Sequence, residues 1–363
     1  MTWLPGPGLL WILPLYGALL ALHLGLPARR VSGYVRDPAG VPLRYRLNGI
    51  LVLLSSVGLW AAACQLRLLA WDALYVHRWE LAEGACMLGA AFTLWVVLTA
   101  PRGPGRSLLQ ELYLGRTANP QWWGGRVDAK MALYLLGAVM LELNLLSFAA
   151  HQVMHFPRHQ SWGVIVYTAL FTFFLLDYLT FEKVHLYTYD FVAENVGFKL
   201  GWGCLVFYPF FYPVGLWAVA DREVPGLPFA WELGAVGLFF CGWVLSRGAN
   251  LQKFWFKVDP GRSVFGLMRP EALTGRDGKT VLVSGFWGLS RHINYLGELL
   301  MATGLTLSLG VLGAWAPWLY PLYYLALLVP RQREDDRRCQ AKYGDLWEEY
   351  RRRVPHRIVP FLY

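Results

Sequence analysis

Charged residues are scarce in this sequence. Only 16% of its 363 residues are Asp, Glu, Lys or Arg, whereas 56% are hydrophobic. Soluble globular chains carry about 25% charged and about 45–50% apolar residues, so the composition excludes an ordinary soluble domain. Uncharged runs long enough to cross about 30 Å of hydrocarbon recur along the chain. The sequence therefore predicts an all-α, polytopic integral membrane protein with about 9–10 transmembrane helices.

Cysteine is scarce as well. The five cysteines, at positions 64, 86, 204, 241 and 339, include no C-x-x-C pair. This spacing argues against a disulfide framework and against a zinc knuckle. Four of the five fall inside apolar segments, where we expect ordinary buried thiols.

Three histidines follow helical spacing, at His151, His155 and His159. On a continuous helix they would share one face, as some metal sites require. Pro157 interrupts that helix, and no cysteine or carboxylate nearby in the sequence completes a ligand set. We therefore expect an interfacial polar loop here and no metal.

Apolar blocks alternate with basic loops along the chain. The blocks lie near 7–26, 48–66, 81–100, 129–150, 162–181, 201–220, 228–246, 293–311 and 313–329. If the N-terminus is outside, the loops and tail expected in the cytosol hold 29 of the 33 Lys and Arg residues, which is the bias typical of cytosolic loops. Topology thus explains the net charge of +9 and leaves nothing that favours nucleic-acid binding. Membrane lipid is the expected surrounding, and no pattern indicates an oligomeric state.

Three polar, basic stretches could form one site on the cytosolic face. In 250–262, Lys253 and Lys257 lie one helical turn apart and could hold a phosphate, or simply anchor a span. In 282–298, polar side chains crowd the mouth of a span, where stranded polar groups are costly and usually serve a ligand. The tail, 330–363, continues the last span as a charged helix that Gly344 interrupts. It could bind a cofactor or lie on anionic lipid.

These stretches, in this order, resemble the sterol reductase family, which includes the C-14 sterol reductases, 7-dehydrocholesterol reductase and the membrane domain of the lamin B receptor. The family's R-x-x-x-D-x-x-x-C-x-x-K-Y-G-x-x-W-x-x-Y tail is matched in register from Arg331 to Tyr350. Residues 281–298 and 250–257 are similar to two further family motifs, and 177–190 to a third. The resemblance covers 108–363, a catalytic membrane domain with the tail 330–363, and leaves 1–107 as N-terminal transmembrane helices.

The resemblance implies NADPH-dependent reduction of a sterol carbon–carbon double bond, with the cofactor in a cytosol-facing C-terminal pocket and the sterol entering from the bilayer. C-14(15) is the bond that the 177–190 stretch favours. The membrane would be the endoplasmic reticulum in a eukaryote or the inner membrane in a bacterium, with the C-terminus cytosolic. Matched to the family motifs, the cofactor-binding residues would be Lys253, Lys257, Leu282, Trp287, Asn294, Tyr295, Arg331, Asp335, Cys339, Lys342, Tyr343 and Tyr350. The chain departs from the family pattern at Pro330, Glu334 and Cys204, which bears on the choice of sterol.

Hydride reduction of an unactivated alkene also needs an acid, because the double bond must be protonated before it becomes an electrophile. Acids at a membrane edge are costly unless they are used or paired. The candidates are Asp177, Glu182 and Asp190, with Tyr189 and neighbouring tyrosines as relays. Helix capping or pairing with nearby cations is the structural alternative.

Other functions remain open at this point. The C-7 and side-chain sterol reductases share most of these residues, and a steroid 5α-reductase has a similar R-H-x-N-Y-x-G-E element. An isoprenylcysteine-type methyltransferase, which uses S-adenosylmethionine, has a similar mouth and ending but would not need the Lys253/Lys257 pair. A non-catalytic scaffold, which is part of the lamin B receptor's role, is disfavoured. The first apolar block begins almost at once, so we expect no appended chromatin-binding domain.

Overall fold

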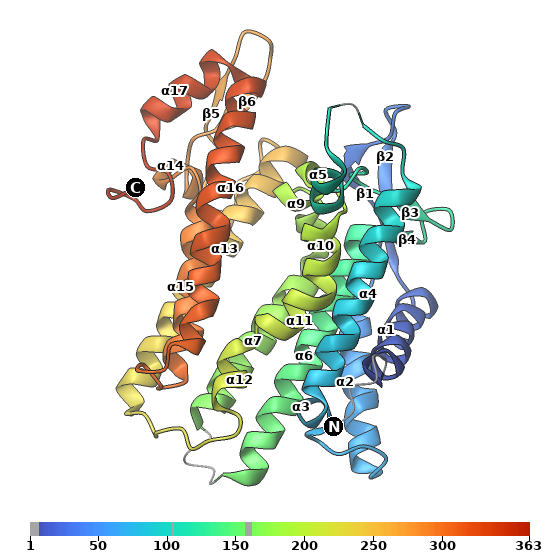
Figure 1. The fold of residues 1–363 in the computed structure, drawn as a ribbon. Coiled ribbons are helices and arrows are strands. Elements are labelled where there is room, and N and C mark those ends of the chain that lie inside the picture. The colour runs from blue at the N-terminus through green and yellow to red at the C-terminus, as the bar shows by residue number, and fades with distance from the viewer. Residues whose placement is uncertain (1–6, 104, 157–161) are drawn as a thin grey trace. The chain divides into compact units, whose positions relative to one another are not determined.

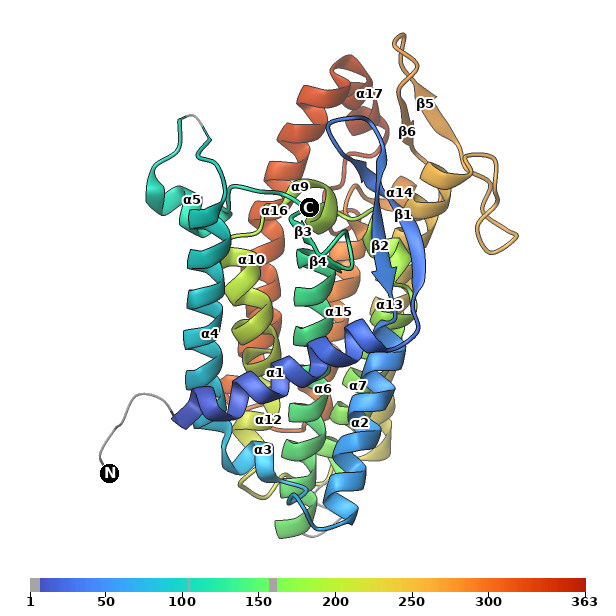
Figure 2. The same cartoon turned by 90° about the vertical axis from the view of Figure 1, so that its right-hand side faces the viewer.

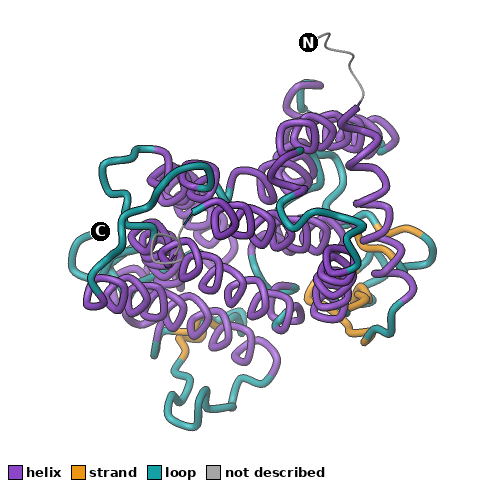
Figure 3. The backbone as a smooth tube through the Cα atoms, turned by 90° about the horizontal axis from the view of Figure 1, so that it is seen from below, coloured by secondary structure: helices purple, strands orange, loops and turns teal. Residues whose placement is uncertain are grey.

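The computed structural model describes residues 7–103, 105–156 and 162–363. The chain folds into two compact units, Met1–Val224 and Pro225–Tyr363. This division reflects which residues pack together in space. The boundary expected at residue 108 came from a sequence resemblance, and that boundary stays a prediction. Strands in the described residues form three two-stranded sheets, and the rest of the described chain consists of helices joined by loops and turns (Figure 3).

Helices of membrane-spanning length confirm the predicted fold class. Within the described ranges, six helical stretches are long and apolar enough to cross a membrane: Gly8–Gly25, Arg78–Thr99, Ala129–His155, Trp162–Thr180, Phe198–Val219 and Phe229–Val258. The other three predicted blocks also coincide with helices, but two of these have only 16 and 17 residues and the third continues into a charged half. The chain is an integral membrane protein, and the nine-span topology stays a prediction.

Within the described residues, the first unit contains twelve α-helices, one π-helical turn and two small hairpins (Figure 1). Its elements are α1(Pro7–Gly25), β1(Arg29–Arg36), β2(Pro42–Leu47), α2(Gly49–Gln65), α3(Ala73–Val76), α4(Arg78–Thr99), α5(Leu108–Leu114), β3(Gln121–Trp122), β4(Val127–Asp128), α6(Ala129–His155), α7(Trp162–Thr180), α8(Glu182–His185), α9(Tyr189–Ala193), α10(Phe198–Trp202), the π-helical turn η2(Gly203–Phe207), α11(Tyr208–Phe211) and α12(Val214–Val219). The hairpins join β1 to β2 and β3 to β4.

Helix α6 forms the centre of this unit. It begins at the cap Asp128, whose side chain accepts a hydrogen bond from the backbone N–H of Met131 at 3.1 Å. Gly137 lets η2 approach closely, since a Cβ there would lie 2.4 Å from the carbonyl oxygen of Cys204. Helix α1 crosses α4 obliquely at a similar contact between Gly8 and Gly84 (Figure 2). Small residues thus set the close helix contacts, as is common in membranes.

The end of α6 corrects one prediction. His151 and His155 belong to the helix, so the polar loop expected there is wrong for these two residues. The helix ends at His155, close before Pro157, as the backbone restriction around proline would favour. His159 and Pro157 lie outside the described residues.

In the second unit the long helices pack against one another, and a short hairpin packs against the tail. Its elements are α13(Phe229–Val258), β5(Ala272–Thr274), β6(Thr280–Leu282), α14(Phe286–Leu289), α15(Ile293–Ser308), the 3₁₀ turn η3(Ala316–Trp318), α16(Leu319–Tyr343) and α17(Asp345–Arg353). Helices α13 and α15 meet at Gly242 and Gly297, where a Cβ on either would lie 2.5 Å from the other's carbonyl oxygen. The predicted interruption of the tail is confirmed, because Gly344, with φ of 54°, separates α16 from α17.

Candidate functional site

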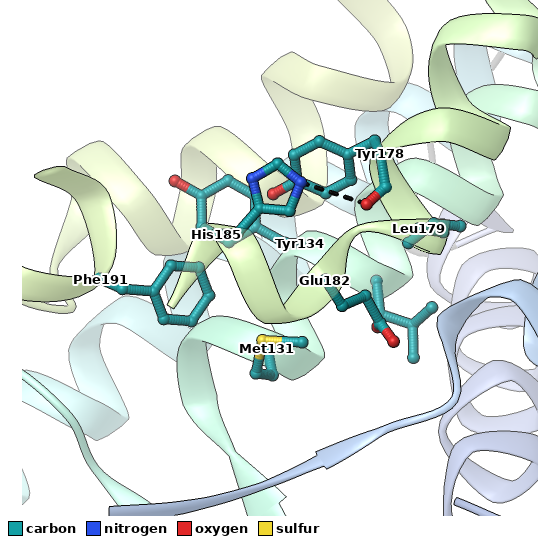
Figure 4. A pocket seen from close by; sticks show the side chains of 8 residues that line it. Met131, Tyr134, Tyr178, Leu179, Glu182, His185 and Phe191 are labelled. Atoms are coloured by element: carbon teal, nitrogen blue, oxygen red, sulfur yellow. Dashed lines mark hydrogen bonds between the residues drawn. The ribbon is translucent and has the colours of Figure 1, made fainter. Parts of the chain in front are cut away.

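A small pocket in the first unit is lined by side chains from α6, α7, α8 and α9 (Figure 4). Its volume is about 10 Å³, close to what a single water molecule needs. The lining residues are Met131, Tyr134, Leu135, Tyr178, Leu179, Glu182, His185 and Phe191. Glu182 is the one predicted acid among them.

Glu182 lies at the first position of α8, one residue after α7 ends. Its side chain is buried, and its Oε2 accepts a hydrogen bond from the backbone N–H of Gly49 at 3.1 Å. Gly49 must lack a side chain, since a Cβ there would lie 2.5 Å from Oε1. Burial raises the pKa of Glu182 to about 7, although the bond from Gly49 opposes the rise. A carboxyl group that holds its proton near neutral pH can act as a general acid.

Further polar groups gather close to this acid. The phenol of Tyr178 interacts electrostatically with Glu182, Asp190, Cys204 and Tyr208. The imidazole of His185 stacks on the Tyr178 ring with centroids 3.9 Å apart. The structure therefore brings together two of the predicted acids and the cysteine at which the chain departs from the family pattern.

Lys130 fixes the backbone of α9, which carries Asp190. The fully buried ammonium group donates hydrogen bonds to the carbonyl oxygens of Asp190 at 2.8 Å and Phe191 at 2.9 Å. Asp177 lies near the end of α7 and Tyr189 at the start of α9, both half-buried, and neither lines the pocket. A catalytic role for these two residues stays a prediction.

The predicted cofactor residues meet in the second unit around Trp287. The Lys253 ammonium lies 4.8 Å from the Trp287 ring centroid, in a cation–π contact. The indole N–H of Trp287 donates to the carbonyl oxygen of Ala249 at 2.8 Å, and the Tyr350 hydroxyl donates to the carbonyl oxygen of Trp287 at 2.9 Å. Because its hydroxyl is engaged, Tyr350 would serve a cofactor by holding Trp287 in place.

The cationic part of this site joins residues far apart in the sequence. Lys257 interacts electrostatically with Lys253, Lys342, Asp335 and Cys339. Three lysine side chains beside one carboxylate suit a ligand that carries both phosphates and hydroxyls. Burial raises the pKa of Cys339 to about 12, so this thiol stays protonated and is not a nucleophile.

Apolar packing supports the same residues. Leu282, on β6, is buried in a cluster with Ala249, Phe286, Trp287 and Ile293. A second cluster holds the other side of the hairpin against α17; its members are Val281, Val283, Leu346, Trp347, Tyr350 and Val354, with Leu273, Cys339 and Tyr343 packed on it. Arg331 lies half-buried at the start of the charged half of α16.

Buried polar atoms at the mouth of α15 fit a ligand. Asn294 Oδ1 and His292 Nε2 are buried and have no hydrogen-bond partner among the described residues. The His292 ring stacks on Tyr295 with centroids 4.9 Å apart, and burial lowers the pKa of His292 to about 3, so the ring is neutral. An unsatisfied buried polar atom costs about 1–3 kcal/mol. These atoms therefore suit the amide and hydroxyl groups of a nicotinamide nucleotide.

Two residues of the site were missed in the sequence. Asp336, next to the predicted Asp335, accepts hydrogen bonds from Arg291 at 2.8 Å and from the Trp347 indole at 3.0 Å. Gln332 is fully buried, and neither of its amide atoms has a partner in the part of the chain that the structure describes. Helical spacing places Gln332 and Asp336 on one face of α16, and that is the one sequence signal that links them.

Comparisons with known proteins agree with these motifs. A model of the ergosterol biosynthesis ERG4/ERG24 family matches residues 9–363, so the similarity extends through the first hundred residues. The Delta(14)-sterol reductase of Arabidopsis thaliana is 32% identical over 93% of this chain and 91% of the relative. The Delta(14)-sterol reductase of Methylotuvimicrobium alcaliphilum is 31% identical over 94% and 80%, and the Delta(14)-sterol reductase TM7SF2 of Mus musculus is 34% identical over 100% and 88%.

Proposed function

Because the chain belongs to the ergosterol biosynthesis ERG4/ERG24 family, we propose that it reduces the C-14(15) double bond of a sterol with NADPH. The names of three similar relatives support the choice of this bond. The observation that carries the proposal is the convergence of Lys253, Lys257 and Lys342 beside Asp335, with Lys253 over the Trp287 ring. Such an arrangement suits the phosphates and ribose hydroxyls of a phosphorylated dinucleotide.

Within the second unit, we assign the binding roles as follows. Lys253 and Lys257 hold the phosphates, including the phosphate that distinguishes NADPH from NADH. Asp335 accepts hydrogen bonds from ribose hydroxyls, and the orphaned Oδ1 of Asn294 accepts one from an amide or hydroxyl group. Trp287 and Tyr295 offer flat apolar surfaces. NADPH, when bound, supplies the hydride.

The chain itself must supply the proton. We propose Glu182 as the acid, because it is buried, faces the pocket and keeps its proton near neutral pH. Its hydrogen bond to Gly49 fixes the direction of the carboxyl group. Asp190, held through its backbone by Lys130, is the second candidate. Protonation creates a tertiary carbocation, which is the electrophile that a hydride can reduce.

The distribution of charged and apolar residues indicates how the chain is oriented in its membrane. The concentration of Lys and Arg in the loops and tail described above supports a cytosolic C-terminus. The sterol, being insoluble in water, would enter from the bilayer. The membrane would be the endoplasmic reticulum if the source is eukaryotic and the inner membrane if it is bacterial.

A comparison of ligands tests the cofactor assignment first. In detergent-purified protein, NADPH at about 100 times its Kd should stabilise the fold by about 2.7 kcal/mol, because a ligand that binds only the folded state raises its apparent stability. NADH at the same concentration should stabilise it much less, and S-adenosylmethionine not at all. Thermal unfolding measures all three. Stabilisation by S-adenosylmethionine alone would replace the reductase proposal with methyl transfer.

Lys253→Ala tests the phosphate assignment. The change removes one ammonium group and its contact with Trp287, so we expect NADPH affinity to fall about 10- to 100-fold, the range for a hydrogen bond to a charged group. NADH affinity should change much less. Arg276→Ala, which removes an exposed cation from the turn between β5 and β6, is the matched control. Equal NADPH affinity in both variants and the wild type would remove Lys253 from the site.

A further inference from the structure

A second cluster of titratable side chains lies at the far end of α6 from Lys130. His151 and His155 occupy the last turns of this helix, and Asp72 immediately precedes α3. One ligand atom from each of the three residues lies within 4.8 Å of the others. The sequence suggested no metal here because no carboxylate was near in the chain, and Asp72, 79 positions away, is the carboxylate that folding brings in.

The two imidazoles are already oriented by hydrogen bonds. His151 Nδ1 donates to the Asp72 carboxylate at 2.9 Å, and His155 Nδ1 donates to the carbonyl oxygen of His151 at 2.8 Å. Metal-binding histidines are commonly held as His155 is, with the other ring nitrogen bonded to a backbone carbonyl or carboxylate. The bond to the backbone fixes the His155 ring and leaves its Nε2 as the atom that can bind a metal.

Packing holds the same groups in place. The His151 ring stacks on Tyr75 with centroids 3.9 Å apart and lies 4.2 Å from the His155 ring. Ser147 Oγ accepts hydrogen bonds from the backbone N–H groups of Leu74 at 3.1 Å and Tyr75 at 3.3 Å, which ties α3 to α6. Asp72 is buried while His155 is exposed, so the cluster is covered by protein on the Asp72 side and accessible on the His155 side.

We propose that Asp72, His151 and His155 bind one divalent transition-metal ion such as Zn²⁺. The ion takes the place of the proton that Asp72 and His151 share, this proton is released to the solvent, and a water molecule completes a tetrahedral site. Imidazole and carboxylate are ordinary zinc ligands at about 2.0–2.2 Å, which places neighbouring ligand atoms roughly 3.3–3.6 Å apart. The present separation of 2.9 Å between Asp72 and His151 needs only a small adjustment to reach this geometry.

The ion would have a structural role. His151 follows Lys130 by 21 positions on a single helix, which corresponds to about 32 Å at 1.5 Å per residue. The metal is therefore remote from the acid pocket. It would link the connection between α2 and α4 to the end of α6, near the two hydrogen bonds that Ser147 accepts from α3.

Zinc titration of the full, detergent-purified chain without a polyhistidine tag tests the site. We expect one zinc ion bound per chain and a rise in the unfolding temperature, because an ion that binds only the folded state stabilises it. His155→Ala and Asp72→Asn should each abolish both effects. Because His155 is exposed, its replacement should leave the fold intact, which helical circular dichroism checks.

His77→Ala is the matched control. His77 lies at the same end of the unit and stacks on Trp11 with centroids 4.8 Å apart, outside the cluster. The His77→Ala variant should bind zinc as the wild type does. Undiminished zinc binding in both His155→Ala and Asp72→Asn, or an equal loss in His77→Ala, would overturn the proposal. Neither outcome depends on reductase activity.

Discussion

Glu182→Gln is expected to lower sterol reduction by about 100- to 10,000-fold, the usual contribution of a general acid. The amide has nearly the same shape, and its oxygen can still accept the hydrogen bond from Gly49 N–H. The variant should therefore fold and bind NADPH normally while lacking a transferable proton. Single-turnover rates with a C-14(15)-unsaturated sterol, measured beside NADPH binding, separate the two effects.

The same carboxyl group predicts the pH dependence of the reaction. Its pKa is raised to about 7 in the folded protein, so the protonated, active form is lost as the pH rises through that value. We expect kcat/KM of the wild type to fall above about pH 7. The raised pKa also means that this group favours the folded state less as the pH rises from about 4.5 to about 7. Unfolding measurements across that range would show a decline that Glu182→Gln lacks.

Two further variants make this test specific. Glu142→Gln alters another buried acid of the first unit, which accepts a hydrogen bond from Thr172 at 2.9 Å but does not line the pocket. Its activity should stay near that of the wild type. Asp190→Asn examines the second candidate acid. Full activity in both Glu182→Gln and Asp190→Asn would eliminate the proposed proton donors.

Asp336→Ala is expected to destabilise the second unit by about 2–3 kcal/mol, because hydrogen bonds to charged groups contribute about 1.5–3 kcal/mol and Asp336 is only partly buried. Arg291 would keep its buried charge without Asp336, and the Trp347 indole would lose its acceptor. Trp347 packs in one cluster with Tyr350, and the Tyr350 hydroxyl holds the backbone of Trp287, so NADPH binding should weaken as well. Thermal unfolding and cofactor titration measure the two losses.

The neighbouring acid provides the comparison. Asp335 lies among the lysines, so Asp335→Ala should weaken NADPH binding and leave the unfolding temperature nearly unchanged. The two adjacent substitutions thus separate a binding role from a structural role. If Asp336→Ala unfolds like the wild type, the ion pair contributes little and Asp336 is not the support that its contacts indicate.

Local chemistry made much of the fold predictable. Apolar length located the helices, and the four-residue spacing of Lys253 and Lys257 correctly placed them on one helical face. The end of α13 was not predictable from apolarity, because the apolar block ends near residue 246 whereas the helix continues to Val258. Helical hydrogen bonds do not depend on lipid, so a helix can continue well beyond the hydrocarbon.

The sequence could not predict which side chains are hydrogen-bond partners when they lie far apart in the chain. The cost of burying an acid pointed to Glu182, but its hydrogen-bond donor, Gly49, is 133 positions away. Asp335 and Asp336 are the same residue type at adjacent positions, so the sequence does not distinguish them. Their contacts do, because Asp336 pairs with Arg291, 45 positions away, and with Trp347, 11 positions away. The same reason explains why Asp72 was not associated with His151.

The tail's contacts have a consequence for the order of events during synthesis. Ser290 Oγ donates to the carbonyl oxygen of Ile358 at 2.9 Å, and the backbone N–H of Arg291 donates to that of His356 at 3.0 Å. Trp287 likewise depends on the Tyr350 hydroxyl. The residues around Trp287 therefore wait for partners that the ribosome makes about sixty to seventy positions later, roughly 3–14 seconds at ordinary elongation rates. Through that interval the nascent protein has the helices up to α13, while α15 and α16 are still being made and the proposed cofactor site is incomplete.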